Sequence, residues 1–305
     1  MASNCLSILI YHRVLDAPDS FLPGEVDITL FDQQLRWIKR IFNVVSLEEG
    51  VKKLGDGELP ARALCITFDD GYKDNYTNAL PILKKHNFPA TFYVSTGFLD
   101  NGIMWNDSII EAFRKTNELR LDLREFNLDK YDLGKDKQKL LYDVIDRVKF
   151  LSFSDRLCAI SEIKRQLNVR SPNNLMMTVD ELQKLSCSGM EIGGHTVHHP
   201  ILSKLDHEQA RNEIVLGKEQ LESITDKEVL SFAYPNGKPG RDYTKANVDI
   251  VRQAGFKVAV STALGVATPS SDIYQLPRFT PWDKSIGKFM LRLYINRYSP
   301  QEDSV

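Results

Sequence analysis

The chain has 305 residues, of which 42% are hydrophobic, so it is long enough to bury a large core without disulfide or metal staples. Its 39 lysines and arginines nearly balance 41 aspartates and glutamates, and no basic stripe interleaved with aromatic residues is present, which argues against nucleic acid as the main partner. The four cysteines show no Cys-x-x-Cys spacing, so neither a zinc knuckle nor a disulfide framework is expected.

The N-terminal stretch contains only a short apolar run, Leu6–Tyr11, and no basic region precedes it. It is therefore interpreted as a core strand and not as a secretory signal. No other apolar stretch approaches the ~20 residues that span a bilayer, so no transmembrane segment is expected. We expect a cytoplasmic protein, and peripheral association with the inner membrane is left open.

Short apolar runs typical of buried strands alternate along the chain with amphipathic segments typical of helices. Helical periodicity is clearest in Leu30–Phe42 and His207–Ile224. The alternation indicates a parallel α/β architecture with crossover helices, in which catalytic groups follow the carboxyl ends of the strands. The predicted strands are Leu6–Tyr11, Ala63–Phe68, Ala90–Val94, Met190–Gly194, Leu230–Tyr234 and Phe256–Ser261.

One interval breaks this alternation. From Trp105 to Ser188 the sequence is charged, with helical periodicity in Lys135–Leu151 and Ser154–Leu167 and no convincing strand between them. We expect a helical insertion between two barrel strands over residues 105–188. Its length suits a role in substrate access or in self-association, and the sequence leaves both open.

Two adjacent carboxylates, Asp69 and Asp70, follow the second predicted strand and precede Gly71. A strand that breaks at its carboxyl end can turn both side chains toward one cleft, where their repulsion must be offset, and a cation would offset it. The alternative is a simple turn, in which Gly71 adopts a positive φ and an aspartate caps the next helix.

Three of the six histidines, His195, His198 and His199, follow the predicted strand Met190–Gly194. On a helical turn, His195 and His199 would share a face at their i, i+4 spacing, and their ring nitrogens would converge on one ion. A carboxylate from another strand end would complete a set of the kind that binds Zn²⁺ and leaves a position for water. The alternative is a polar turn whose histidines cap the following helix.

The motifs TFDDG, at Thr67–Gly71, and HTVHHP, at His195–Pro200, together resemble those of the polysaccharide deacetylase family, also called NodB-homology proteins or family four carbohydrate esterases. The similarity extends to YHRV, FAYPNG and YQLPRF and is least specific in the insertion. The resemblance implies a distorted (β/α)7 barrel forming a single domain over residues 1–305, with the insertion 105–188 inside it. It also implies a metal-dependent hydrolase that removes N-acetyl groups from amino sugars.

In that family the second aspartate of the pair and two histidines bind the metal, which maps here onto Asp70, His195 and His199. The resemblance makes Asp69 the general base that accepts a proton from the attacking water. The expected metal is Zn²⁺, with Co²⁺ and Ni²⁺ as alternatives. His198 is the alternative to His199, although the family motif assigns the i+4 residue.

The sequence departs from the usual third motif of the family, Arg-x-Pro-x-Gly. Ala233 in FAYPNG stands where an arginine that orients the base is expected, and Tyr234 and Asn236 are left to form the substrate loop. The backbone N–H of Asn236 still suits an oxyanion donor, because that role needs no particular side chain. We expect Arg278 to replace the missing cation beside Asp69, the alternative being a surface salt bridge.

The family's usual C-terminal Leu-x-x-His motif is also absent, because no histidine follows His207. His12 ends the first predicted strand, at the same rim as the other groups, and some relatives that act on exopolysaccharides carry an N-terminal histidine as the acid. An imidazole with a pKa near neutrality can protonate a departing amine. We expect His12 to be the general acid, and the alternative is a buried structural histidine.

Three competing functions are considered. A sugar deformylase would use the same chemistry on a smaller acyl group. A non-haem iron oxygenase would also use two histidines and one carboxylate, but it is usually a β-rich jelly roll and has no use for a second, free aspartate. A non-catalytic carbohydrate-binding protein would account for the missing arginine and histidine, yet not for the intact set Asp69, Asp70, His195 and His199. Whether the amino sugar is polymeric, lipid-linked or nucleotide-linked is left open.

Overall fold

The computed structural model describes residues 4–100, 102–298 and 304–305. Two compact units divide the chain: the first comprises Met1–Asp100 and Met177–Val305, and the second comprises Asn101–Met176. Residues 1–3, which the predicted domain includes, lie outside the described residues. Among the described residues, no helix combines the length and the hydropathy that crossing a bilayer requires.

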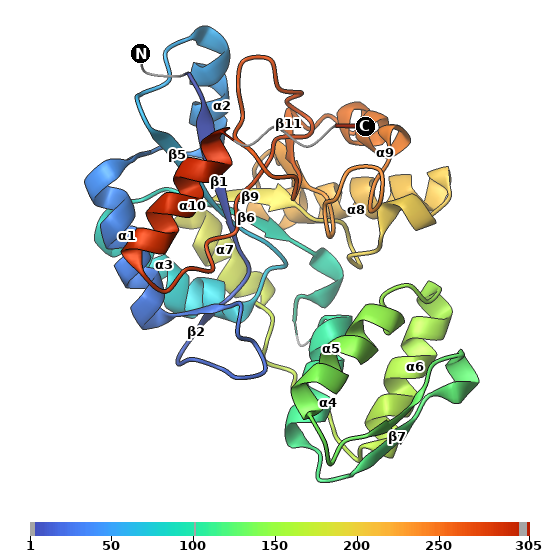
Figure 1. Ribbon diagram of the computed structural model, residues 1–305. Coiled ribbons are helices and arrows are strands. Elements are labelled where there is room, and N and C mark those ends of the chain that lie inside the picture. The colour runs from blue at the N-terminus through green and yellow to red at the C-terminus, as the bar shows by residue number, and fades with distance from the viewer. Residues whose placement is uncertain (1–3, 101, 299–303) are drawn as a thin grey trace. The chain divides into compact units, whose positions relative to one another are not determined.

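A parallel sheet forms the centre of the first unit (Figure 1). β1 and β5 pair in register along their full length, from Leu6 with Ala63 to Tyr11 with Phe68. A short strand, β4 (Asn43–Val44), pairs with the beginning of β5. The order of the main strands is β1 (Leu6–Tyr11), β5 (Ala63–Phe68), β6 (Thr91–Val94), β9 (Glu191–Gly194), β10 (Ser231–Ala233) and β11 (Val258–Val260).

The segment Leu276–Phe279 closes this sheet. Leu276 bonds through its backbone to β11, where its N–H donates to Ala259 at 2.9 Å. Phe279 bonds to β1, where its N–H donates to Ile8 at 2.8 Å and its carbonyl accepts from Ile10 at 3.0 Å. Because the segment joins the two end strands of the sheet, the fold is barrel-like, and the predicted distorted (β/α)7 barrel is confirmed.

Helices surround the sheet, and their apolar faces supply much of the core. α8 begins with a capping box, in which the Asp206 side chain accepts from the N–H of Gln209. The helices of the first unit are α1 (Ile28–Ile41), α2 (Leu47–Asp56), α3 (Leu80–His86), α7 (Val179–Cys187), α8 (His207–Thr225), α9 (Lys245–Gln253) and α10 (Ile286–Tyr298). Shorter elements are β2 (Val14–Leu15), β3 (Val26–Asp27), η1 (Asn75–Ala79), η2 (Thr96–Phe98) and η4 (Leu202–Lys204).

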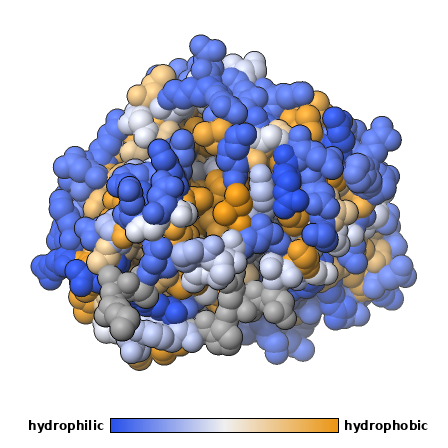
Figure 2. Space-filling model, turned by 90° about the horizontal axis from the view of Figure 1, so that it is seen from above, coloured by the Kyte–Doolittle hydropathy of each residue, from blue (hydrophilic) through white to orange (hydrophobic). Residues whose placement is uncertain are grey.

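A cavity of about 440 Å³ lies where the strands of the barrel begin. Apolar side chains gather near the middle of this face, with hydrophilic side chains around them (Figure 2). The residues that line the cavity include Val51, Met190, Ile192, Val229, Leu230 and Val258. The predicted catalytic residues do not line this cavity; they follow the opposite, carboxyl ends of the strands.

In its described residues, the second unit contains three α-helices and a short antiparallel hairpin of β7 (Arg120–Asp122) and β8 (Lys130–Asp132), joined through η3 (Arg124–Phe126). Its helices are α4 (Trp105–Lys115), α5 (Lys137–Val148) and α6 (Phe153–Gln166). The predicted insertion, residues 105–188, runs past this unit, because α7 buries Leu182 and Leu185 in the core of the first unit. The hairpin was not predicted, since each of its strands has only three residues and includes charged ones.

Candidate active site

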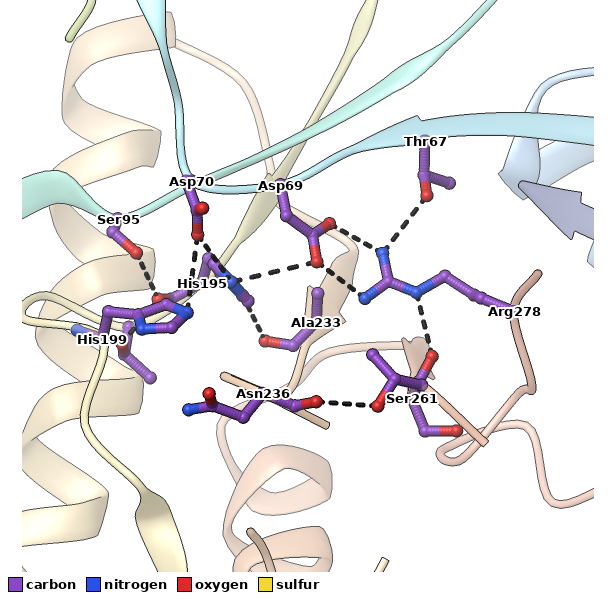
Figure 3. A network of polar contacts seen from close by, with 12 residues as sticks. Thr67, Asp69, Asp70, Ser95, His195, His199, Ala233, Asn236, Ser261 and Arg278 are labelled. Atoms are coloured by element: carbon purple, nitrogen blue, oxygen red, sulfur yellow. Dashed lines mark hydrogen bonds and ion pairs between the residues drawn. The ribbon is translucent and has the colours of Figure 1, made fainter. Parts of the chain in front are cut away.

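Asp69 and Asp70 face the same centre because the backbone changes conformation between them. The N–H of Asp69 still continues the ladder with β1, donating to the Tyr11 carbonyl at 2.9 Å. Asp70 then adopts a φ of 78° and Gly71 a φ of 88°, in the left-handed region that non-glycine residues rarely enter. This break lets the two neighbouring carboxylates converge, as Figure 3 shows. Strain of this kind is characteristic of functional sites.

His195 and His199 lie in a loop after β9, so the predicted helical turn is wrong. Thr196 and His199 both have positive φ, at 66° and 52°, and the Thr196 hydroxyl accepts from the His199 N–H at 3.0 Å. Gly217 of α8 allows this arrangement, because a Cβ there would lie 3.0 Å from the Thr196 backbone carbon. The loop brings the two imidazoles together, with ring centroids 4.8 Å apart.

The side chains of Asp70, His195 and His199 point toward one another (Figure 3). The Nε2 atoms of both histidines lie 3.4 Å from Asp70 Oδ1. His195 Nδ1 lies 2.7 Å from the carbonyl oxygen of Ala233. Because a carbonyl can only accept, Nδ1 carries a proton, and Nε2 is the nitrogen that faces Asp70.

This arrangement fits a divalent cation. Asp70 Oδ1, which the Nε2 atoms of both histidines face, is buried without a hydrogen-bond partner among the described residues, and such groups are rare unless something else satisfies them. Burial lowers the pKa of His199 to about 4 despite the opposing charge of Asp70, so its imidazole is neutral at neutral pH. One carboxylate and two imidazoles form a set that Zn²⁺ binds, although Co²⁺ and Ni²⁺ accept the same ligands.

Arg278 forms a buried, bidentate ion pair with Asp69. Its Nη1 and Nη2 each lie 2.7 Å from one carboxylate oxygen, and its Nε donates to the Ser261 carbonyl at 2.9 Å. Because Arg278 is only 1% exposed, the alternative of a surface salt bridge is wrong. Burial by itself raises the pKa of Asp69, but the opposing interactions, led by the guanidinium charge of Arg278, together outweigh it and hold the pKa below its ordinary value. Asp69 Oδ2 also lies 3.9 Å from His195 Nε2.

His12 follows β1, and its carbonyl accepts from the Asn75 amide at 2.8 Å. His12 lines a cavity of about 160 Å³ together with Glu25, Thr280 and Trp282. Burial acts to lower the pKa of His12, but the negative charges of Asp70, Glu25 and Asp69 outweigh it and raise the pKa above its ordinary value. The imidazolium form therefore persists to higher pH than in an ordinary histidine. That His12 donates a proton to substrate stays a prediction.

Tyr234 and Asn236, which were both expected in a substrate loop, have different surroundings in the structure. The Tyr234 side chain is fully buried, stacks on Tyr243 and donates to the Tyr274 carbonyl at 3.1 Å. Tyr234 is therefore a core residue, whereas a place in a substrate loop was expected. Asn236 has a φ of 60°, and its carbonyl accepts from the Thr262 hydroxyl at 2.7 Å. Within the described part of the chain, nothing accepts a hydrogen bond from its N–H, as an oxyanion donor requires.

His198, the alternative ligand, lies outside this group. Its side chain is 48% exposed and its Nδ1 lies 2.8 Å from Glu213 Oε1. The carbonyls of Ala233 and Ser261, which orient His195 and Arg278, were not predicted, because any residue type can supply a backbone oxygen. Ser95, whose hydroxyl donates to the His195 carbonyl at 2.8 Å, was not predicted either.

Known proteins are similar to this chain in sequence and in fold. The family model for polysaccharide deacetylase matches residues 56–149 and 152–259. A poly-beta-1,6-N-acetyl-D-glucosamine N-deacetylase of Staphylococcus aureus is 28% identical over 210 residues, covering 62% of this chain and 71% of that protein.

Two solved structures have the same fold. The deacetylase PplD of Streptococcus pyogenes, in complex with acetate, has a TM-score of 0.64 at 22% identity and covers 94% of this chain and 97% of its own. IcaB from Ammonifex degensii has a TM-score of 0.62 at 20% identity, with coverage of 93% and 97%.

Proposed function

Because the chain belongs to the polysaccharide deacetylase family, we propose that it is a metal-dependent carbohydrate N-deacetylase. It hydrolyses the N-acetyl group of an amino sugar in a glycan, glycolipid or sugar precursor and releases acetate. One observation carries this proposal: the convergent ligand set of Asp70, His195 and His199 lies beside a second carboxylate, Asp69, that is held in place but does not belong to the set.

The two carboxylates have different surroundings, and these suit different tasks. Asp70 meets two imidazoles and would hold the cation with His195 and His199. A divalent cation there would supply Lewis acidity, which lowers the pKa of water and polarises a carbonyl. Asp69 instead meets Arg278, which fixes the plane of its carboxylate.

Asp69 would accept the proton of the attacking water. Each of its oxygens bonds to Arg278 through one lone pair, and each oxygen keeps a second one. Oδ2 is the oxygen that also approaches His195, at 3.9 Å from Nε2, so we assign proton acceptance to this atom. The ion pair keeps Asp69 ionised and therefore ready to accept at neutral pH.

The acetyl oxygen and the departing nitrogen need a hydrogen-bond donor and an acid. We assign the first role to the N–H of Asn236, whose positive φ is supported by the bond from Thr262 to its carbonyl. We assign the second to His12, whose raised pKa favours the protonated form that an acid needs. Protonation spares the nitrogen from leaving as an unstable anion.

The substrate class is supported by the relative from Staphylococcus aureus, which by its name deacetylates poly-beta-1,6-N-acetyl-D-glucosamine. A formamide would meet the same residues as an acetamide, so a sugar deformylase is the alternative function. Acetate and formate release should therefore be measured on the same panel of N-acylated amino sugars, in free, polymeric, nucleotide-linked and lipid-linked form.

The assay is run on chelated enzyme and after addition of Zn²⁺, Co²⁺ or Ni²⁺. We expect acetate release that is lost on chelation and restored by at least one of the metals. Formate release alone would make the protein a deformylase. Sugar binding without release of either acid, with every metal, would overturn the proposal and indicate a carbohydrate-binding protein.

A further inference from the structure

Exposed apolar side chains concentrate at the C-terminal helix. The described residues include fourteen large apolar side chains that are exposed, and six of them lie between Trp282 and Tyr298. Single exposed apolar residues are normal on a protein surface, but a cluster of this kind marks an interaction site. The six are Trp282, at 57% exposure, Ile286, at 42%, Leu291, at 57%, Tyr294, at 62%, Ile295, at 53%, and Tyr298, at 68%.

α10 is apolar on two opposite sides. One side packs on the barrel through Phe289 and Leu293, which are 0% and 5% exposed. The other side carries Leu291, Tyr294 and Tyr298, whose spacings of three and four residues align them along one stripe. The rings of Tyr294 and Tyr298 lie 4.8 Å apart. We call the exposed residues Leu291, Tyr294, Ile295 and Tyr298 the outer face of α10. The helix itself lies on the outside of the barrel (Figure 1).

The flanks of this outer face are basic. No acidic residue occurs between Lys284 and Tyr298, and helical geometry places Lys288 on one flank and Arg297 on the other. Arg292 lies on the same flank as Lys288, and its Nη1 forms an ion pair with Asp283 Oδ2 at 2.9 Å. Because the whole chain carries a net charge of −2, this positive charge is a local feature.

We propose that the outer face of α10 docks the protein on an anionic lipid surface. An interfacial helix buries an apolar stripe among the acyl chains while lysines and arginines on its flanks meet the phosphates of the headgroups. Tyrosine and tryptophan, here Tyr294, Tyr298 and Trp282, are the side chains that favour this boundary.

A second copy of the chain is the competing occupant. A two-fold interface centred on α10 would bring the helix against itself. Lys288 and Arg297 would then approach basic residues of the other copy with no acidic residue of α10 to offset them, and like charges in an interface are unfavourable. The charge pattern therefore favours anionic lipid.

Docking through α10 has a consequence for how a substrate reaches the site. Trp282, an exposed residue of the segment that leads into α10, also lines the cavity beside His12. An amino sugar carried by a lipid in the same surface would reach the site without leaving the membrane. This part of the inference rests on the proposed deacetylase function, whereas the docking surface does not.

The test is flotation of the full chain with vesicles of phosphatidylglycerol and phosphatidylcholine in equal parts, compared with phosphatidylcholine alone. We expect binding to the anionic vesicles only, weakened by added salt. Leu291→Glu and Tyr294→Glu should each reduce binding about tenfold or more. Lys288→Gln should reduce it about fivefold, as expected for one basic residue at such a surface.

Two matched controls separate the docking surface from general exposure. Leu216→Glu alters an apolar residue on α8 that is 47% exposed, and Lys245→Gln alters an exposed lysine on α9. Both should bind like the wild type. Equal loss in Leu216→Glu, or equal binding to both kinds of vesicle, would overturn the proposal. A dimer that Leu291→Glu dissociates, without vesicle binding by the wild type, would assign the outer face to a second copy.

Turnover assays test the delivery of a lipid-linked substrate separately from docking on the lipid surface. Leu291→Glu should deacetylate a water-soluble amino sugar at the wild-type rate but lose activity on a glycolipid in anionic vesicles. Equal rates on the glycolipid would reject its delivery from the surface. Absence of turnover by the wild type on every substrate would contradict the proposed function and leave the vesicle-binding result to decide docking.

Discussion

Two carboxylates at opposite ends of the barrel, the half-buried Glu191 and the buried Asp70, have opposite surroundings. Glu191, at the start of β9, accepts from the Thr91 hydroxyl at 2.6 Å and from the N–H groups of Leu47 and Glu48 at 3.2 and 3.4 Å. These N–H groups belong to the first turn of α2, where a negative charge is favoured by the helix dipole. Asp70, beyond the end of β5, leaves Oδ1 without a hydrogen bond and faces two imidazoles.

The difference separates a structural carboxylate from a functional one. Each group that contacts Glu191 above is a hydrogen-bond donor of the protein itself. Glu191 therefore connects α2 to the sheet, and its carboxylate needs no ligand. Asp70 lies on strained backbone with its oxygen and two imidazole nitrogens directed at one another, which folding alone does not favour. A ligand would complete this end of the barrel.

The largest expected effect comes from removing a metal ligand. His195→Ala or His199→Ala should lose most of the bound metal and reduce kcat/KM by at least about 10³-fold, because Lewis-acid stabilisation contributes several kcal/mol. Metal analysis and acetate release measure this. His198→Ala is the matched control, since its side chain bonds to Glu213 at the surface. Full metal content in His199→Ala together with loss in His198→Ala would reverse the assignment.

Asp69→Asn tests whether the second carboxylate reacts instead of binding. We expect it to keep the metal and to lower kcat by about 10³-fold, because the amide cannot accept the proton of water. Metal content and kcat are measured on the same preparation. Loss of metal in this variant would show that Asp69 is a ligand, and a near-normal kcat would reject it as the base.

His12→Ala should lower kcat by about 10²-fold on a sugar acetamide while metal content stays normal. An activated aryl ester, whose leaving group needs no proton, should show little loss. In the wild type, activity on the acetamide should fall as the pH rises through the raised pKa of His12, because only the protonated imidazole is an acid. An equal loss on both substrates would identify a structural histidine.

Arg278→Met should destabilise the fold by about 3–5 kcal/mol at neutral pH, because it leaves Asp69 buried without its partner. In the wild type the pKa of Asp69 lies below its ordinary value of 3.8, so the pair contributes stability above that value and loses it as the pH falls. Denaturation in the presence of chelator should therefore show a gap between variant and wild type that narrows on acidification. A gap independent of pH would contradict this account.

The smallest effect is expected at the other end of the barrel. Glu191→Gln should lower the free energy of unfolding by about 1–2 kcal/mol, because an amide replaces a charged acceptor at the first turn of α2. It should leave kcat and metal content unchanged. A loss of activity larger than the loss of folded protein would show that the two ends are coupled and would remove the contrast with Asp70.

Local sequence determined the strands and the residues of the site. β1 and β5 have their predicted bounds, and β6 and β9 differ from theirs by one residue, because buried parallel strands are continuous apolar runs bounded by polar groups. Asp70, His195 and His199 were named from two short motifs. The short strands β2, β3, β4, β7 and β8 were not predicted, since two or three residues carry too little periodicity.

Tertiary structure decided how these residues meet. The positive φ values of Asp70 and Thr196 depend on neighbours such as Ser95 and Gly217, which lie far from them in sequence. Arg278 reaches Asp69 because its segment closes the barrel between β11 and β1, a long-range pairing that local pattern does not encode. The direction of a side chain is set by packing, which is why Tyr234 turned into the core although its position in the motif suggested the substrate loop.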